Sequence, residues 1–196
     1  RVSHLTAKPL PVWPLQTYAS DKNTFQLLIS LIINDNEAET HEMTLQNLGF
    51  SKFKLTRHTH VDISHSKIDL QKTVKKLIQS GVFLNTNKEW ATVQGPKTKE
   101  VFDAKKEKFF PAPVVNEEGM ISFNLLVREK PDFMGMSKLD TIQKRLKMPE
   151  ITGVKVGTLW TISFETKSKK VAEDNLKKMI ETNLFFNPHR QEAYIV

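Results

Sequence analysis

The sequence predicts an α+β fold built from two tandem copies of one small unit. The main observation is a repeat. Residues 74–85, Val-Lys-Lys-Leu-Ile-Gln-Ser-Gly-Val-Phe-Leu-Asn, recur without a gap as residues 176–187, Leu-Lys-Lys-Met-Ile-Glu-Thr-Asn-Leu-Phe-Phe-Asn. The second observation is that alternating and helix-periodic segments follow the same order on both sides of the break at residues 94–96, Gln-Gly-Pro. A repeat of this kind indicates a duplicated unit, and we expect the two copies to pack as an internal pseudo-dimer.

The first half begins with an arm and a strand. Residues 7–15 are rich in proline and predict an extended arm, with Trp13 as its anchor. Residues 25–33 alternate in hydrophobicity and predict a strand. The expected apolar face of this strand consists of Phe25, Leu27, Ile29, Leu31 and Ile33.

A helix and an ambiguous extended segment come next. Residues 34–36, Asn-Asp-Asn, predict a turn and a helix cap, and Gly49 predicts the helix end. Residues 53–63 alternate, which fits either one bent strand or a tight hairpin near Arg57 and His58, and both remain open. The expected apolar side of the helix consists of Ala38, His41, Leu45 and Leu48.

A second helix and a short strand are expected to complete the first half. The helix begins near Asp69 and stops before Gly81, and the strand covers residues 90–93. After the break, the charged residues 97–108 predict a short exposed helix that the following prolines end. The core side of the longer helix consists of Val74, Leu77 and Ile78.

The second half repeats this order. It predicts a strand at 121–127, a helix with Leu139, Ile142 and Leu146 on its core side, an extended segment at 154–165, a helix at 169–183 and a strand at 193–196. Two helices on one face of a mostly antiparallel sheet predict a two-layer, ferredoxin-like unit in each half.

The expected organisation follows from these elements. Each unit is small and would be marginally stable alone, so we expect the two to bury their remaining apolar faces against each other. The predicted segments are an arm at 1–20, a first unit at 21–96, a charged linker at 97–118 and a second unit at 119–196.

Composition excludes several classes of function. The chain has no cysteine, which rules out disulfides, thiolate zinc sites and a cysteine nucleophile. Its seven glycines form no phosphate-binding loop or dinucleotide fingerprint; Gly153 and Gly157 are expected at a strand end or bend. No apolar run suffices for a membrane helix, and no signal-peptide pattern is present, so we expect a cytoplasmic protein with no membrane partner. The net charge of +7 is interpreted as a lysine-rich solvated surface.

His58, His60 and Asp62 form the one candidate metal site. If their segment is one straight strand, alternation places all three on the same face, where nitrogen and oxygen ligands could meet. The alternative is a solvent-facing row, and a hairpin would separate the three. At an offset of 101 the second half has Leu159, Thr161 and Ser163, so a site would not be duplicated. We predict no catalytic, cofactor-binding or metal-binding residues.

Other polar and aromatic residues are better explained by structure than by chemistry. His41, matched by the same offset to Ile142, is expected to be a buried or interface histidine. The carboxylates at Glu37, Glu39 and at residues 117–118 are expected at caps and turns. An RNA-binding sheet would need paired aromatics on its central strands, and these are absent, so we expect no nucleic-acid partner. The large aromatic residues expected in the core are Trp160 and Phe164.

The second half resembles a known family. Residues 126–131, Leu-Val-Arg-Glu-Lys-Pro, a helix, residues 153–157, Gly-Val-Lys-Val-Gly, and Asn187-Pro188 followed by Glu192-Ala-Tyr194 are similar to the PurS subunit of phosphoribosylformylglycinamidine synthase. The first half is more diverged, with Thr86 where the family has proline. The family's Asp-Pro-Gln-Gly turn is also absent, and Thr158 stands where a lysine is usual.

The resemblance implies a function in assembly. PurS-like subunits bring together the synthetase and glutaminase subunits of this glutamine-dependent amidotransferase in de novo purine biosynthesis, and they carry no catalytic residues or cofactors. We therefore expect a tandem PurS-like, non-enzymatic accessory subunit with those two partners and a possible homo-oligomer. The alternatives are a small-ligand-binding regulatory module of paired ferredoxin-like units and an RNA-binding protein.

Overall fold

In the part of the chain that the structure describes, one mixed nine-stranded sheet is combined with four helices. The computed structural model describes residues 13–95, 99–103, 106–112 and 119–196. The helices are α1 (Asn36–Asn47), α2 (Leu70–Gln79), α3 (Phe133–Lys144) and α4 (Lys169–Glu181). The strands are β1 (Gln16–Thr17), β2 (Thr24–Leu31), β3 (Phe53–His65), β4 (Glu89–Gln94), β5 (Lys99–Asp103), β6 (Lys108–Pro111), β7 (Ile121–Glu129), β8 (Ile151–Phe164) and β9 (Gln191–Ile195).

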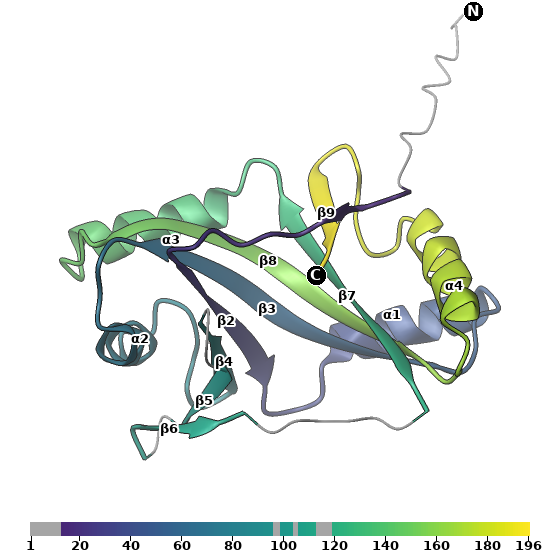
Figure 1. Cartoon of the computed structure of the whole chain (residues 1–196), viewed down its shortest axis with the longest axis horizontal. Helices are drawn as coiled ribbons and strands as arrows, with labels where there is room; N and C mark the ends of the chain where they lie inside the picture. The colour runs from purple at the N-terminus through teal and green to yellow at the C-terminus, as the bar shows by residue number, and fades with distance from the viewer. Residues whose placement is uncertain (1–12, 96–98, 104–105, 113–118) are drawn as a thin grey trace, which may run out of the picture.

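The two halves share this single sheet. Its strand order is β1-β9-β7-β8-β3-β2-β4-β5-β6, and the long strands β3 and β8 join the halves in antiparallel register from Phe53 opposite Phe164 to His65 opposite Ile151. Among the described strands, every pairing is antiparallel except that of β1 with β9. The segment 53–63 is therefore one strand and not a hairpin. The α+β class is confirmed, but the expected pair of sheets is a single continuous one (Figure 1).

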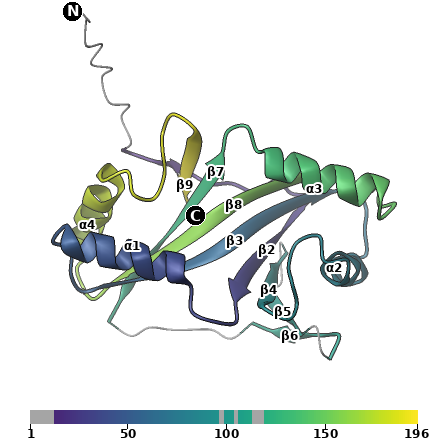
Figure 2. The same ribbon diagram turned by 180° about the vertical axis from the view of Figure 1, so that it is seen from behind.

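All four helices cover the same face of the sheet, and each hydrophobic core contains residues from both halves. Figure 2 shows α1 beside α4 at one end and α2 near α3 at the other. In the α2–α3 core, Phe25 and Leu77 of the first half pack with Ile142 and Val154 of the second. In the α1–α4 core, Leu45 of the first half packs with Trp160 and Leu176. The first helix of each half therefore shares a core with the second helix of the other half.

The repeated segment has the same geometry in both copies. The amide of Asn85 donates to Glu89 Oε2 and that of Asn187 donates to Gln191 Oε1, both at 2.7 Å. At the same position of each turn the backbone is left-handed, with φ of 71° at Gly81 and 56° at Asn183. Repeated residues thus maintain a helix end and a turn. The buried pairs are Val74 and Leu176, Leu77 and Met179, Ile78 and Ile180, and Phe83 and Phe185.

The difference in residue number between equivalent positions of the two halves changes along the chain. The helix caps Asp35 and Asp132 give an offset of 97. The hydroxyl pair Thr24 and Ser64 (3.1 Å) has its counterpart in Ser122 and Ser163 (2.8 Å), which gives offsets of 98 and 99. The single offset of 101 assumed for the strands was wrong, because the connecting loops differ by a few residues.

Two other expectations about the first half were wrong. Residues 97–108 do not form a helix where they are described; they contribute β5 and the start of β6 in a hairpin. The reason is that Phe102 and Phe109 stack at 4.9 Å and pack on the α2–α3 core. The apolar faces were also drawn too long: three of the expected core residues are exposed, namely Leu31, Ile33 and Leu48.

The remaining expectations concern the ends of the chain and its helices. Of the N-terminal arm, residues 1–12 lie outside the described residues, while Trp13 packs against the α1–α4 core as expected. Within the described segments, the helices are too short and too polar to cross a bilayer.

Candidate functional site

The helix-free face of the sheet carries the main polar cluster. Residues 18–23, here called the strap, link β1 to β2 and cross β7, β8 and β3 on this face (Figure 1). Leu126 and Leu159 are buried here although they belong to neither helix-covered core. We infer that the strap shields these two residues from solvent. The ring of Tyr18, a strap residue, packs against the guanidinium of Arg128.

Asp62 is the centre of this cluster. Its Oδ2 accepts hydrogen bonds from the Tyr18 hydroxyl and from Arg128 Nη2. The guanidinium of Arg128 also lies 5.1 Å from the centroid of the Tyr18 ring. Asp62 and Arg128 are both buried. A buried ion pair is stable only when geometry and further hydrogen bonds offset its desolvation, and the Tyr18 hydroxyl supplies one such bond.

Gly157 makes room for this ion pair. A Cβ at this position would lie 2.5 Å from Val127 O and 2.8 Å from Arg128 Cγ. The absence of a side chain therefore lets Arg128 pass over β8 to reach Asp62 on β3. Gly157 lies well inside β8, opposite His60. Gly157 therefore does not mark a strand end.

His60 is the least satisfied member of the cluster. Both ring nitrogens are buried without a hydrogen-bond partner among the described atoms, as are Asp62 Oδ1 and Arg128 Nε. His60 Nε2 lies 3.9 Å from Asp62 Oδ1, too far for a direct hydrogen bond. Burial lowers the pKa of His60 to about 4, against the attraction of Asp62. Burial and the Asp62 carboxylate raise the pKa of Tyr18 to about 12.

The three candidate metal ligands lie on one face but do not converge. The ring of His58 is hydrogen-bonded to Ser30 Oγ at 2.7 Å, while Asp62 is held by Tyr18 and Arg128. Among the residues that the structure describes, no three His, Asp or Glu side chains are placed to hold a metal ion. The first half thus has a charged cluster and not a ligand set.

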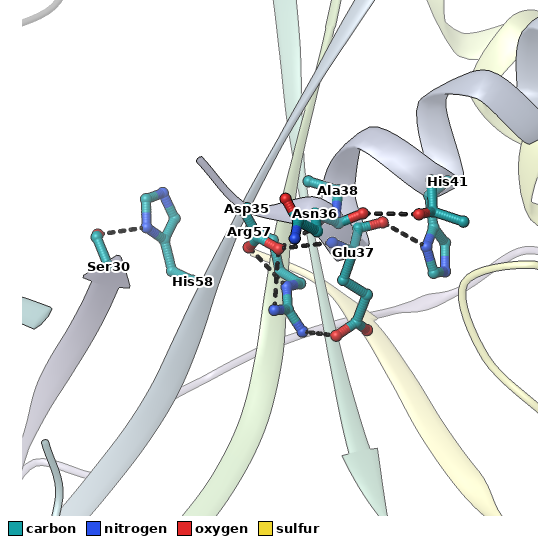
Figure 3. Close-up of polar contacts among 9 residues, drawn as sticks. Ser30, Asp35, Asn36, Glu37, Ala38, His41, Arg57 and His58 are labelled. Atoms are coloured by element: carbon teal, nitrogen blue, oxygen red, sulfur yellow. Dashed lines mark hydrogen bonds and ion pairs between the residues drawn. The ribbon is translucent and has the colours of Figure 1, made fainter. Parts of the chain in front are cut away.

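A second polar cluster joins α1 to β3 on the opposite face. Arg57 donates from Nε to Asp35 Oδ2 at 2.8 Å and from Nη2 to Asp35 Oδ1 at 3.0 Å, and Nη1 pairs with Glu37 (Figure 3). Asp35 also caps α1 through the amides of Glu37 and Ala38. Burial alone would raise the pKa of Asp35, but these partners hold it below its ordinary value. This cluster orients the helix.

The pair of Ser30 and His58 has the contact of a nucleophile with its base, but it lacks the rest of a catalytic site. Burial lowers the pKa of His58, and Lys99 adds to the shift. A catalytic histidine is normally oriented by a carboxylate. Figure 3 shows Asp35 directed at Arg57, away from the His58 ring. No hydrogen bond found in the described residues joins His58 to a carboxylate.

Most of the other sequence-based assignments are structural. His41 stacks on Trp160 at 4.7 Å and contacts Phe185, so it is an interface histidine as expected. Its equivalent at offset 97 is Lys138, not Ile142, which corresponds to the buried Leu45. Glu37 and Glu39 lie in the first turn of α1, as expected, and residues 117–118 lie outside the described residues. Both predicted core aromatics are buried, namely Trp160 and Phe164.

A polar hollow of about 400 Å³ lies beside the strap. It is lined by Tyr18, Lys22, Gln26 and Gln94, among others. Neither this hollow nor the roles of Tyr18 and Arg128 were predicted from the sequence. Two features of the sequence could have indicated the buried ion pair: Arg128 directly after the apolar run 125–127, and Gly157 inside an alternating strand.

The landmark residues of the second half meet near the same cluster. Lys130 Nζ lies 2.8 Å from Glu192 Oε1, and the Tyr194 hydroxyl donates to Glu192 Oε2 at 2.6 Å. The Tyr194 ring is 6.1 Å from that of Tyr18.

Comparisons with protein-family models, curated proteins and solved structures find no match.

Proposed function

We propose that this chain is a non-catalytic, PurS-like accessory subunit that assembles the synthetase and glutaminase subunits of phosphoribosylformylglycinamidine synthase in the cytoplasm. The observation that carries the proposal is a duplicated strand–helix–strand–helix–strand unit, fused through β3 and β8, whose second copy holds the family-like landmarks in one place. Arg128, Gly157 and Tyr194 of those landmarks surround Asp62 and Tyr18. These contacts are between residues of the fold itself, so we assign the landmark residues a structural role.

The finer fold assignment belongs to the same proposal. Each half supplies two helices on one face of antiparallel strands, in the sheet orders β3-β2-β4 and β8-β7-β9. We regard these as two ferredoxin-like units. The exchange of first helices between the cores supports a fused dimer, because neither half can bury its apolar face alone.

An exposed apolar patch at the start of α3 supports a role in assembly. Phe133, Met134 and Met136 are 59–70% exposed. Their equivalents at offset 97 in α1 are Asn36, Glu37 and Glu39, which are polar. Exposed apolar patches of this kind commonly mark protein–protein contacts, and methionine adapts readily to a partner surface. One end of the fused pair is therefore suited to a partner that the other end would not bind.

The experiment is reconstitution with candidate synthetase and glutaminase subunits in the presence of glutamine and a magnesium nucleotide. We expect glutamine-dependent activity to require this chain. Replacing Phe133, Met134 and Met136 together with serine should weaken the assembly at least tenfold, whereas serine at the exposed Met43 and Leu48 of α1 should not. Equal activity with and without the chain would refute the assignment.

The polar hollow beside the strap favours one second candidate, a small-ligand-binding regulatory module. Gln26, Gln94 and Lys22 offer amide and ammonium groups to a polar ligand. Thermal unfolding with and without nucleotides and amino acids separates the candidates. A shift of several degrees that Gln26→Leu abolishes would favour the ligand-binding module over the scaffold.

A further inference from the structure

The hairpin formed by β5 and β6 creates a surface that the sequence did not predict. Phe102 and Phe109 face the helices, so alternation places Val101 and Phe110 on the helix-free face. The register puts Leu28, Thr92, Val101 and Phe110 in one row across β2, β4, β5 and β6. Trp90 belongs to the same face, opposite Ser30.

Two aromatic rings on this face are open to solvent. Trp90 is 38% exposed and Phe110 is 40% exposed, while the other aromatic residues of the hairpin are turned to the core. The rings lie on β4 and β6, two strands apart, which corresponds to roughly 10 Å. The strap crosses the other half of the sheet and leaves these strands uncovered (Figure 1).

Lysines belong to the same surface. Lys99 and Lys108 alternate onto the same face and are exposed, and Lys106 Nζ lies 5.4 Å from the Phe110 ring centroid. Asp103, also on this face, interacts with Lys106. The exposed Gln94, opposite Lys99, adds an amide to this face, whereas Thr92 is buried. A sheet face that combines exposed aromatics, lysines and hydrogen-bonding side chains suits unpaired bases joined by phosphates.

We propose that the helix-free face of β4, β5 and β6 binds single-stranded RNA. Bases stack on Trp90 and Phe110, the phosphates lie along Lys99, Lys106 and Lys108, and Gln94 contacts a 2′-hydroxyl. The spacing of the rings requires splayed bases, which single strands and not duplexes supply. The expectation of no nucleic-acid partner rested on the central strands β3 and β8, and this surface lies on outer strands. The proposal does not depend on the assembly function.

The test is fluorescence anisotropy of the full-length protein with a labelled 12-nucleotide oligo(U) at 50–300 mM KCl. Trp90→Ala and Phe110→Ala should each weaken binding by roughly 5- to 100-fold. Phe133→Ala, which removes an exposed ring from α3, should leave binding unchanged. Three phosphate contacts predict a slope of log K against log salt of about −2, which Lys99→Gln with Lys108→Gln should reduce. The matched charge control is Lys144→Gln with Lys169→Gln on the helices.

Three outcomes would overturn the proposal. The first is binding that Trp90→Ala, Phe110→Ala and the conservative Trp90→Phe leave unchanged, because the interaction would then be with a generally basic surface. The second is equal competition by polyglutamate, which would make the surface a site for acidic protein segments. The third is tighter binding of oligo(dT) than of oligo(U), which would remove RNA as the occupant. Circular dichroism of each variant verifies that it is folded.

Discussion

Thr59 of β3 lies directly opposite Thr158 of β8, and the two threonines are also each other's equivalents in the two halves. The offset between them is 99, the same as that between Ser64 and Ser163, which make matching hydroxyl contacts. A residue that pairs with its own counterpart marks a local two-fold axis. The fused sheet is therefore arranged about this pair, as in an isologous dimer interface.

The polar cluster around Asp62 occurs on one side of this axis because equivalent positions carry different residues. At offset 99 the equivalent of Gly157 is His58, and at offset 98 the equivalent of Arg128 is Ser30. Ser30 and His58 bond to each other within the first half, whereas the smaller Gly157 lets Arg128 extend across the axis to Asp62. Equivalent backbone positions therefore carry a serine–histidine hydrogen bond in the first half and an arginine–aspartate ion pair that joins the two halves.

The packing of α1 in the α1–α4 core predicts that alanine at Leu45 destabilises the protein strongly and that alanine at Leu48 does so only weakly. Leu45 is fully buried in the α1–α4 core, most of whose residues come from the second half, so Leu45→Ala should lower the free energy of unfolding by about 2–5 kcal/mol. Leu48 is 58% exposed, and Leu48→Ala should cost less than about 1 kcal/mol. Urea unfolding measures both, and equal losses would contradict the placement of α1.

Two glycines of β8 should respond differently to alanine. Gly157→Ala brings a Cβ against a carbonyl oxygen and the Arg128 side chain, so we expect a loss of about 1–3 kcal/mol or more. Gly153→Ala meets Ser64 at 3.3–3.4 Å and should be tolerated within about 1 kcal/mol. Thermal and urea unfolding of the two variants give the comparison, and a neutral Gly157→Ala would rule out the crossing of Arg128 above it.

The phenol of Tyr18 should make the protein sensitive to high pH. Its pKa is about 12 in the folded protein and about 10 when unfolded, so its contribution is present below pH 10 and is lost as the pH rises to 12. Tyr18→Phe should cost about 1–3 kcal/mol at pH 8 and should remove this dependence. Urea unfolding at pH 8 and pH 11 tests both effects. A wild-type and variant difference that stays constant between them would contradict the expected ionisation.

His60 should control stability on the acid side. Its pKa is about 4 in the folded protein and about 6.5 when unfolded, so unfolding takes up a proton between these values and stability falls as the pH drops through that window. The difference amounts to roughly 3 kcal/mol. His60→Leu, which copies the equivalent Leu159, should flatten the profile, and the exposed His189→Gln should not. An unchanged slope in His60→Leu would show that His60 is not the responsible group.

The sequence predicted single elements well where the pattern is local. The cap within residues 34–36 and the helix start near Asp69 follow from residue type, and the strand at 121–127 and the buried face of α2 follow from periodicity within one segment. Residues 97–108 were misassigned because their charges mask Phe102, whose burial depends on a distant core. Of the candidate site, the shared face of His58, His60 and Asp62 was predictable from alternation alone.

The partners of Asp62 were not predictable, since Tyr18 and Arg128 lie 44 and 66 residues away in the sequence. The α+β class and the apolar side of each helix are predictable from the sequence, because they depend on residues two to four positions apart, and the repeat of residues 74–85 at 176–187 is visible directly. The pairing of β3 with β8 into one sheet, and the sharing of a core between each first helix and the other half's second helix, appear only in the folded chain. Those choices depend on strand pairing and on surface buried between segments far apart in the chain, which no local pattern records.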